Sequence, residues 1–236
     1  MSPCGRFHPD AVDSFDPLNG VPGKAAGRER ATGRGAGARG ALFGGSFDPV
    51  HVAHLIVAEA AADALGCAIR FLPAREQPLK RGARPGHLAT PEQRAEMLDL
   101  ALAGNPRLSV EPVELGLPTP SYTVRTLRAL SEQKGEGEGE AEGGRNRFTL
   151  LLGADAARDL AEWWEVEALP ELADIVVFAR PGASVVRHPL IKRVIPVPVI
   201  DLSATEVRER VRQRRSIRYL VPDSVREYIA SHGLYR

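Results

Sequence analysis

Two histidines three residues apart, just after a pair of glycines, are the residues of this chain whose types and spacing could do chemistry. The apolar segment Ala41–Phe43 leads into Gly44 and Gly45, and a helix is expected to begin shortly afterwards. In its first turn His51 and His54 would share one helix face, because side chains at i and i+3 are neighbours. Helix N-termini attract phosphate through N–H groups that lack intrahelical partners, and a glycine turn lets a ligand approach the backbone. The spacing therefore favours a nucleotide site.

The same segment also has an interpretation that needs no ligand. Asp48 is a good helix N-cap and Pro49 a good first helical residue, so local folding alone could explain both. Glycines after a strand often mark only a tight turn, and a single histidine on a helix is usually structural. The ordered combination of these features is what favours the functional interpretation.

A second group of polar residues, near the C-terminus, could hold an anion. Ser203 and Glu206 have the spacing of a capping box, so a helix should begin there. Thr205 lies in its first turn, and Arg208 lies within reach of the same end. Hydroxyls, N–H groups and a guanidinium together suit the oxygens of a phosphate chain. The alternative is an ordinary cap followed by a solvated arginine face, but beside the first motif a polyphosphate clamp is favoured.

Composition limits the class of protein. With 236 residues, 43% of them hydrophobic, the chain is long enough for one domain with a sizeable core. A net charge of +1 gives no reason to expect a nucleic-acid partner. Two cysteines, Cys4 and Cys67, are too few for a disulfide framework and form no zinc motif, which fits a reducing cytoplasm.

The sequence also gives no reason to expect a membrane partner. The apolar segment 52–65 contains charged residues and cannot span a bilayer. The N-terminus lacks the basic-then-apolar pattern of a secretory signal. We therefore expect a soluble cytoplasmic protein, and the sequence leaves its oligomeric state open.

From residue 40 onward, strand and helix patterns alternate. The expected strands are Ala41–Phe43, Ala68–Leu72, Leu108–Pro112, Phe148–Leu152, Ile175–Ala179 and Arg193–Val197. The expected helices lie near 50–65, 91–103, 121–131 and 155–169, with two more at 204–213 and 222–231. Such alternation implies parallel strands joined by right-handed crossovers. We predict an α/β fold, a Rossmann-like doubly wound parallel sheet with a C-terminal helical segment, in which ligands bind beyond the carboxyl ends of the strands.

Two stretches differ from this pattern. Residues 1–39 are rich in glycine, proline and arginine, so we expect a disordered extension or an over-long start to the reading frame. A solvated tail is favoured there over weak RNA binding. Residues 131–146 contain alternating glycine and glutamate, which is typical of a flexible acidic insertion at the surface. The folded domain is then 40–236.

Several ordered motifs resemble those of known nucleotide-handling enzymes. The run Gly44–His54 (GGSFDPVHVAH) resembles the HxGH signature of the nucleotidylyltransferase superfamily, and Ser203–Arg208 (SATEVR) resembles its second, ISSTxxR-type signature. Three blocks between them are similar to those of bacterial nicotinate-nucleotide adenylyltransferases: Pro120–Leu127 (PSYTVRTL), Leu152–Asp155 followed by Trp163, and Arg180–Gly182 (RPG). The likeness covers residues 41–236 and implies that the folded domain is a nucleotidylyltransferase domain.

Two positions depart from that family's pattern. Ala53 stands where the family usually has glycine, which adds a methyl group in a crowded turn but leaves both histidines in place. The segment Gln77–Lys80 (QPLK) stands where the family often has a PPHK-like segment. The histidine is missing there, so Lys80, helped by Arg75 or Arg81, is left to reach phosphate.

The resemblance implies the reaction of nicotinate mononucleotide with ATP, which gives deamido-NAD (nicotinate adenine dinucleotide) and pyrophosphate in NAD biosynthesis. The implied catalytic residues are His51, His54 and Arg208, with the imidazoles supplying hydrogen bonds and charge to the α-phosphate. The residues implied to bind ATP are Gly44, Gly45, Ser46, Phe47, Lys80, Asp155, Ser203 and Thr205. Those implied to bind the acceptor are Thr123, Trp163, Trp164 and Arg180. Mg²⁺ is expected to arrive with ATP, since no compact carboxylate cluster suggests a protein-held metal.

Some of these roles have rivals. Asp155 could bind a ribose or simply cap the next helix. Trp163 could stack on the pyridine ring, with Thr123 and Trp164 offering backbone N–H groups to the nicotinate carboxylate. The two tryptophans could instead be core anchors; adjacent residues on a helix point in different directions, so at least one should pack. A sibling enzyme with another acceptor, or a non-catalytic nucleotide-binding module, is the alternative function.

Overall fold

The computed structural model describes residues 40–76, 88–133, 147–179, 187–198 and 200–236. These residues all belong to one compact unit. The expected extension 1–39 and most of the expected insertion 131–146 lie outside the described residues, as do Lys80 and Arg180.

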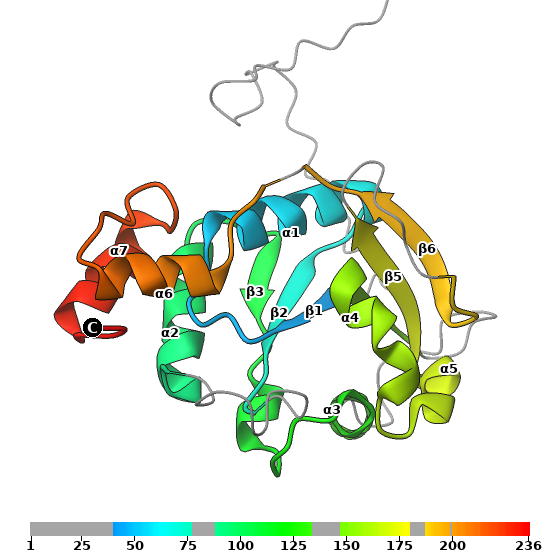
Figure 1. The fold of residues 1–236 in the computed structure, drawn as a ribbon. Coiled ribbons are helices and arrows are strands. Elements are labelled where there is room, and N and C mark those ends of the chain that lie inside the picture. Colours follow the sequence, from blue (N-terminus) through cyan, green and yellow to red (C-terminus); the bar gives the residue numbers. More distant parts are fainter. Residues whose placement is uncertain (1–39, 77–87, 134–146, 180–186, 199) are drawn as a thin grey trace, which may run out of the picture. The chain divides into compact units, whose positions relative to one another are not determined.

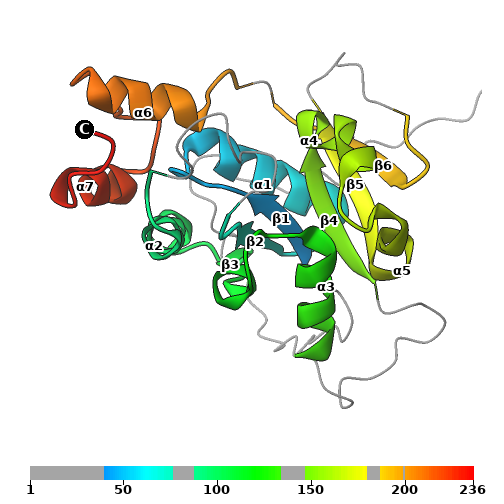
Figure 2. The same ribbon diagram turned by 60° about the horizontal axis from the view of Figure 1, so that its bottom comes forward.

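Six parallel strands form one sheet in the order β3-β2-β1-β4-β5-β6 (Figures 1 and 2). The strands are β1 (Ala41–Gly45), β2 (Ile69–Pro73), β3 (Leu108–Val110), β4 (Phe148–Gly153), β5 (Ala173–Ala179) and β6 (Ile191–Pro196). The chain builds β2 and β3 on one side of β1 and then crosses to β4 on the other, so β1 and β4 meet at a topological switch point. This confirms the predicted α/β Rossmann-like sheet, and all six expected strands are present.

Helices cover both faces of this sheet. They are α1 (Val52–Leu65), α2 (Pro91–Leu102), α3 (Thr123–Glu132), α4 (Ala154–Arg158), α5 (Leu169–Leu172), α6 (Ala204–Arg212) and α7 (Asp223–Ser231), with 3₁₀ turns η2 (Val113–Gly116), η4 (Leu160–Glu162) and η5 (Val166–Ala168). Successive strand side chains point to opposite faces. Phe43 therefore packs into one core with α1, α2 and the C-terminal helices, whereas Leu42 packs into a second core with α3 and α4. Figure 2 shows α1 and α3 on opposite sides of the strands.

The expected helix over 155–169 is the largest difference from the sequence prediction, because the structure has α4, two 3₁₀ turns and α5 in its place. Trp163 has an extended backbone (φ −71°, ψ 143°) and Glu165 a left-handed one (φ 50°), so neither continues a helix. Pro170 lies in the first turn of α5 and lacks the N–H that a helix interior needs. None of the helices in the described ranges is long and apolar enough to span a membrane.

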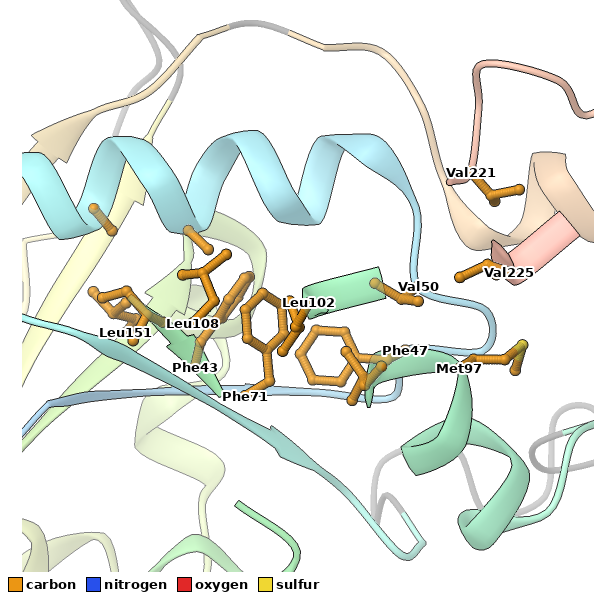
Figure 3. Packing of buried hydrophobic residues seen from close by; sticks show 14 of the residues in the cluster. Phe43, Phe47, Val50, Phe71, Met97, Leu102, Leu108, Leu151, Val221 and Val225 are labelled. Carbon is orange, nitrogen blue, oxygen red and sulfur yellow. The ribbon is translucent and has the colours of Figure 1, made fainter. Parts of the chain in front are cut away.

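Aromatic rings build the core next to the end of β1. The ring of Phe47, from the segment after β1, lies edge-on to Phe43 (5.6 Å between centroids) and tilted against Phe71 (5.2 Å). All three are buried, and Figure 3 shows them below α1. Val50 and Val225 of α7 belong to the same cluster. The segment between β1 and α1 is thus held by packing from the sheet and from the C-terminal helices.

Candidate active site

The glycine pair occupies the last two positions of β1 rather than a turn, so the expected glycine turn is wrong in detail. The chain turns at Phe47, whose backbone is left-handed (φ 49°). A Cβ on Gly45 would lie 2.8 Å from Cζ of Phe47, so glycine there makes room for that ring. Gly44 is exposed, and a Cβ on it would meet nothing within 4 Å. Of the two glycines, Gly44 is the one that leaves open space beside the β1–α1 loop (residues 46–51).

The two histidines lie together at the start of α1. This helix begins at Val52 with His51 as its N-cap, so the interpretation of Asp48 as N-cap and Pro49 as first helical residue is wrong. The backbone N–H of His51 donates to Nδ1 of His54 (3.2 Å). The two imidazoles stack, with centroids 3.7 Å apart and 21° between their planes. The i, i+3 spacing therefore does bring the two rings together, although the helix begins three positions later than Pro49, the expected first helical residue.

Both imidazoles are neutral at pH 7 in this structure. Burial lowers the pKa of His51 to about 4, and burial together with the neighbouring His51 lowers the pKa of His54 well below its usual range. Because Nδ1 of His54 accepts a backbone hydrogen bond, its proton lies on Nε2. Without a bound anion, the pair therefore offers neutral N–H groups.

The lowered histidine pKa predicts a loss of stability in mild acid. The unfolded chain binds a proton on His51 below the ordinary pKa of 6.5, whereas the folded chain binds it only near pH 4, so the free energy of unfolding falls as the pH drops through that interval. Between pH 7.5 and pH 5, His51 alone should account for a loss of about 2 kcal/mol. Chemical denaturation at both pH values, for the parent and for His51→Asn, measures it. The variant should lose that part of the pH dependence, and an identical pH dependence in both proteins would contradict the neutral assignment.

Arg208 joins the second motif to the first. Its Nη1 donates to the carbonyl oxygen of Asp48 (2.7 Å), 160 positions away in the sequence, and its Nη2 donates to Oγ1 of Thr205 (3.1 Å). Arg208 is therefore not part of a solvated arginine face. Ser203, the N-cap of α6, and Thr205 are exposed beside it. Two hydroxyls and a guanidinium are thus presented together at the start of α6, next to the β1–α1 loop.

The capping box expected at the start of α6 forms in only one direction. Oγ of Ser203 accepts a hydrogen bond from the N–H of Glu206 (3.2 Å). The carboxylate of Glu206 instead forms an ion pair with Arg210 (3.1 Å), one turn further along the helix. The predicted start of the helix at Ser203 is confirmed, but Glu206 does not complete the capping box.

Asp48 anchors the β1–α1 loop, a role that sequence reasoning missed. Its buried carboxylate accepts hydrogen bonds from the N–H groups of Leu88 (2.9 Å) and Ala89 (3.2 Å) and from the hydroxyl of Tyr235 (2.7 Å). Burial and this carboxylate raise the pKa of Tyr235, so its hydroxyl stays a donor. Tyr235 lies 187 positions from Asp48, and local spacing cannot link residues so far apart.

The two adjacent tryptophans occupy different environments, although they do not lie on a helix as expected. Trp163 packs against the core under α3 and β4, which agrees with the core-anchor interpretation for this residue. Trp164 is 40% exposed and stacks on Tyr122 (4.9 Å, 25°), with the guanidinium of Arg125 over both rings. Thr123, next to Tyr122, is the first residue of α3, so its N–H has no partner within the helix. The stack therefore brings Trp164 close to the start of α3.

Asp155 lies just beyond the carboxyl end of β4, the strand next to β1. It is in the first turn of α4, whose N-cap is Gly153, so the helix-cap interpretation of Asp155 is wrong. Its side chain is 89% exposed and forms an ion pair with Arg158. The carboxylate is therefore accessible to a ligand at the switch point of the sheet.

Comparisons with known proteins agree with this geometry. The cytidylyltransferase-like family model matches residues 42–210. A protein of Roseiflexus castenholzii named probable nicotinate-nucleotide adenylyltransferase is 44% identical over 208 residues, covering 84% of this chain and 98% of that protein. A protein of the same name from Thermus thermophilus is 43% identical over 198 residues, covering 83% of this chain and 98% of the relative.

A solved structure supports the fold. Plasmodium falciparum nicotinic acid mononucleotide adenylyltransferase complexed with NaAD is similar with a TM-score of 0.60 and 20% identity, covering 83% of this chain and 96% of that one. At this identity the likeness concerns the fold alone, whereas the family model and the sequence relatives extend over most of the chain. The chain belongs to the cytidylyltransferase-like family and, within it, to the nicotinate-nucleotide adenylyltransferases.

Proposed function

We propose that this chain transfers the adenylyl group of ATP to nicotinate mononucleotide, giving deamido-NAD and pyrophosphate, in NAD biosynthesis. The observation that carries the proposal is the hydrogen bond from Arg208 to the carbonyl of Asp48, because it brings the start of α6 to the loop that leads into the two histidines. Family membership supports the reaction type. The site lies beyond the carboxyl ends of β1 and β4, where ligands of such sheets bind.

The proposed reaction is an in-line displacement at phosphorus. A phosphate oxygen of nicotinate mononucleotide attacks the α-phosphorus of ATP, and the bond from that phosphorus to the bridging oxygen breaks as pyrophosphate departs with the electron pair. The nucleophile is already an anion, so no strong general base is needed. Catalysis then rests on positioning and on donors aimed at the developing charge.

The residues around the β1–α1 loop are assigned to these atoms as follows. The imidazoles of His51 and His54 donate to the α-phosphate and the bridging oxygen. In support, Nδ1 of His51 is buried and has no hydrogen-bond partner among the described residues. Ser203, Thr205 and Arg208 hold the departing phosphates, because these three side chains are presented together at the start of α6.

Further contacts to ATP are proposed from the ends of the strands. Gly44 leaves room for the nucleotide, and Ser46 and Phe47 offer backbone N–H groups. Asp155 accepts hydrogen bonds from the ribose, because its exposed carboxylate lies at the switch point. Lys80 is assigned to phosphate by the resemblance alone.

For the acceptor, we assign the nicotinate carboxylate to the backbone N–H groups of Thr123 and Trp164. In support, the ring of Trp164 stacks on that of Tyr122, the residue before Thr123. Trp163 stacks on the pyridine ring while part of its side chain packs in the core. Arg180 is assigned to the same subsite by the resemblance alone.

Magnesium is proposed to enter with ATP. Within the part of the chain that the structure describes, no group of three or more His, Cys, Asp or Glu side chains is placed to hold a metal. Mg²⁺ prefers oxygen ligands and retains several waters, so we assign it to the phosphates of ATP. ATP and nicotinate mononucleotide are the proposed partners, without nucleic acid or membrane, and the reducing cytoplasm is the proposed location.

A panel of acceptors tests the proposed reaction. With labelled ATP, nicotinate mononucleotide should give labelled deamido-NAD, and pyrophosphate release should depend on it. Nicotinamide mononucleotide should have a kcat/KM lower by at least about tenfold, because lost hydrogen bonds to a charged group cost about 1.5–3 kcal/mol each. Faster turnover with pantetheine phosphate, or with CTP as donor, would assign the chain to a sibling reaction. If no acceptor gives pyrophosphate release, the chain would be a non-catalytic nucleotide-binding module.

Alanine substitutions at the two glycines should separate ligand approach from folding. Gly44→Ala should change stability by less than about 0.5 kcal/mol, since its methyl enters open space, but raise the KM for ATP about tenfold. Gly45→Ala should lower stability by about 1–3 kcal/mol, because its methyl overpacks against Phe47. Chemical denaturation and steady-state kinetics measure the two effects. A KM for ATP in Gly44→Ala equal to that of the parent would mean that the bound nucleotide does not lie against the end of β1.

A further inference from the structure

Arg94 is a fully buried side chain that joins two segments of the candidate active site. It lies on α2 with 0% of its surface exposed. Its Nη1 donates to the carbonyl of Ser46 (2.7 Å) and its Nη2 to the carbonyl of Arg75 (3.1 Å). Burial lowers the pKa of this guanidinium, but arginine stays charged in proteins. The fold therefore keeps a desolvated charge at a position where an apolar residue would avoid that cost.

One of the two carbonyls belongs to the β1–α1 loop. Ser46 is the first residue of that loop, and the carbonyl of Asp48, two positions later, receives Arg208. Guanidinium groups from α2 and α6 thus hold two carbonyls on either side of Phe47. The path of the loop toward the histidines is fixed by these two bonds together with the packing of the Phe47 ring.

The other carbonyl belongs to the segment after β2, which is tied to the acceptor side. The N–H groups of Arg75 and Glu76 donate to Oγ of Ser121 (3.0 and 3.2 Å), and the N–H of Ser121 donates to the carbonyl of Glu76 (2.8 Å). Ser121 lies two residues before Thr123, at the start of α3. Hydrogen bonds therefore lead from Arg94 through the Arg75–Glu76 segment to Ser121, and the chain itself connects Ser121 to Thr123 of the proposed nicotinate subsite.

We propose that Arg94 is a positioning residue that sets the ATP subsite and the acceptor subsite in register, so that the nucleophilic phosphate meets the α-phosphorus in line. The inference rests on the proposed function. Each substrate binds within its own subsite, but the reaction needs both at once, and a misplacement of about 1 Å costs about a hundredfold in rate. Loss of the guanidinium therefore lowers kcat while each substrate alone keeps its affinity.

Arg94→Met and Arg94→Lys test this proposal, with Leu98→Ala as a matched control. Methionine keeps an apolar stem and makes neither bond, whereas a single ammonium cannot reproduce the fork that spans two carbonyls. Leu98 is equally buried on the same helix, so its truncation lowers stability without removing a bond to either segment. The readouts are kcat, the Kd and stoichiometry of nicotinate mononucleotide alone and of a non-hydrolysable ATP analogue alone, and amide hydrogen exchange over residues 44–50 and 74–76.

We expect kcat of Arg94→Met to fall by about thirtyfold to a hundredfold, with each Kd within about threefold of the parent at full stoichiometry, and Arg94→Lys to recover part of the loss. Exchange should rise about tenfold in both segments together, and only in the Arg94 variants. A parent-like kcat in folded Arg94→Met, parent-like exchange, or Kd values that weaken in step with kcat would overturn the proposal. If the parent forms no deamido-NAD, the proposed function fails, and the exchange rates still decide whether Arg94 joins the two segments.

Discussion

Replacing His54 by alanine is expected to lower kcat by about a hundredfold or more, because the loss of one preorganised donor in such a site costs about 3 kcal/mol of barrier. Its Nε2–H is a donor held in place by the bond from the backbone of His51 to Nδ1. The KM for ATP should change less than kcat, because the donor acts on charge that develops in the transition state. Steady-state kinetics at saturating nicotinate mononucleotide measure both constants.

Two further variants control for packing. His54 also contacts the rings of Phe43 and Phe47 (6.3 and 5.0 Å between centroids), so alanine leaves a cavity as well as removing a donor. His54→Asn fills part of that space and keeps an N–H donor, so it should recover part of the activity. His232→Ala removes an imidazole stacked on Tyr228 of α7 and should leave kcat within about twofold. A near-normal kcat in His54→Ala would remove the histidines from the mechanism.

Replacing Arg208 by methionine should lower kcat/KM for ATP by about a hundredfold to a thousandfold. The guanidinium has two tasks, since it holds the carbonyl of Asp48 and is presented with Thr205 at the start of α6. We expect a higher KM for ATP together with a lower kcat, because the proposed phosphate contact exists in the ground state and strengthens as pyrophosphate departs. Arg208→Lys should restore little, since a point charge cannot replace a planar fork.

Arg212 provides the matched control for this variant. It lies on the same helix and forms an ion pair with Glu209 at the surface. Arg212→Met therefore removes the same charge from α6 without touching the β1–α1 loop, and its kinetics should match the parent. Equal losses of kcat/KM in Arg208→Met and Arg212→Met would show that α6 contributes only its overall charge. The proposal that Arg208 holds the departing phosphates would then be wrong.

The sheet could be predicted from the sequence because burial dominates it. Strands such as β4 and β5 are continuous apolar runs that must be covered on both faces, and the helical segments between them leave few topologies. The segment 155–169 could not be predicted in the same way. Its apolar spacing resembles a helix, but the left-handed Glu165 and the position of Pro170 divide it into short turns. The spacing of apolar residues does not reveal the backbone dihedral angles that end a helix.

The candidate site could be predicted where the spacing is local and was missed where contacts are long-range. His51 and His54 meet because three positions separate them, but their neutral state follows from burial, which spacing does not show. The bond between Tyr235 and Asp48 has no local signal. Arg94 had one: Met97 and Leu98, three and four positions later, are buried, so this charge lies on the apolar face of its helix.

A crystal structure with a non-hydrolysable ATP analogue and nicotinate mononucleotide tests the central claim most directly. The account predicts the α-phosphate about 3 Å from Nε2 of His54, with the β- and γ-phosphates on Arg208 and the start of α6. A triphosphate bound elsewhere, or one that reaches the histidines while Arg208 keeps only its bond to Asp48, would contradict it.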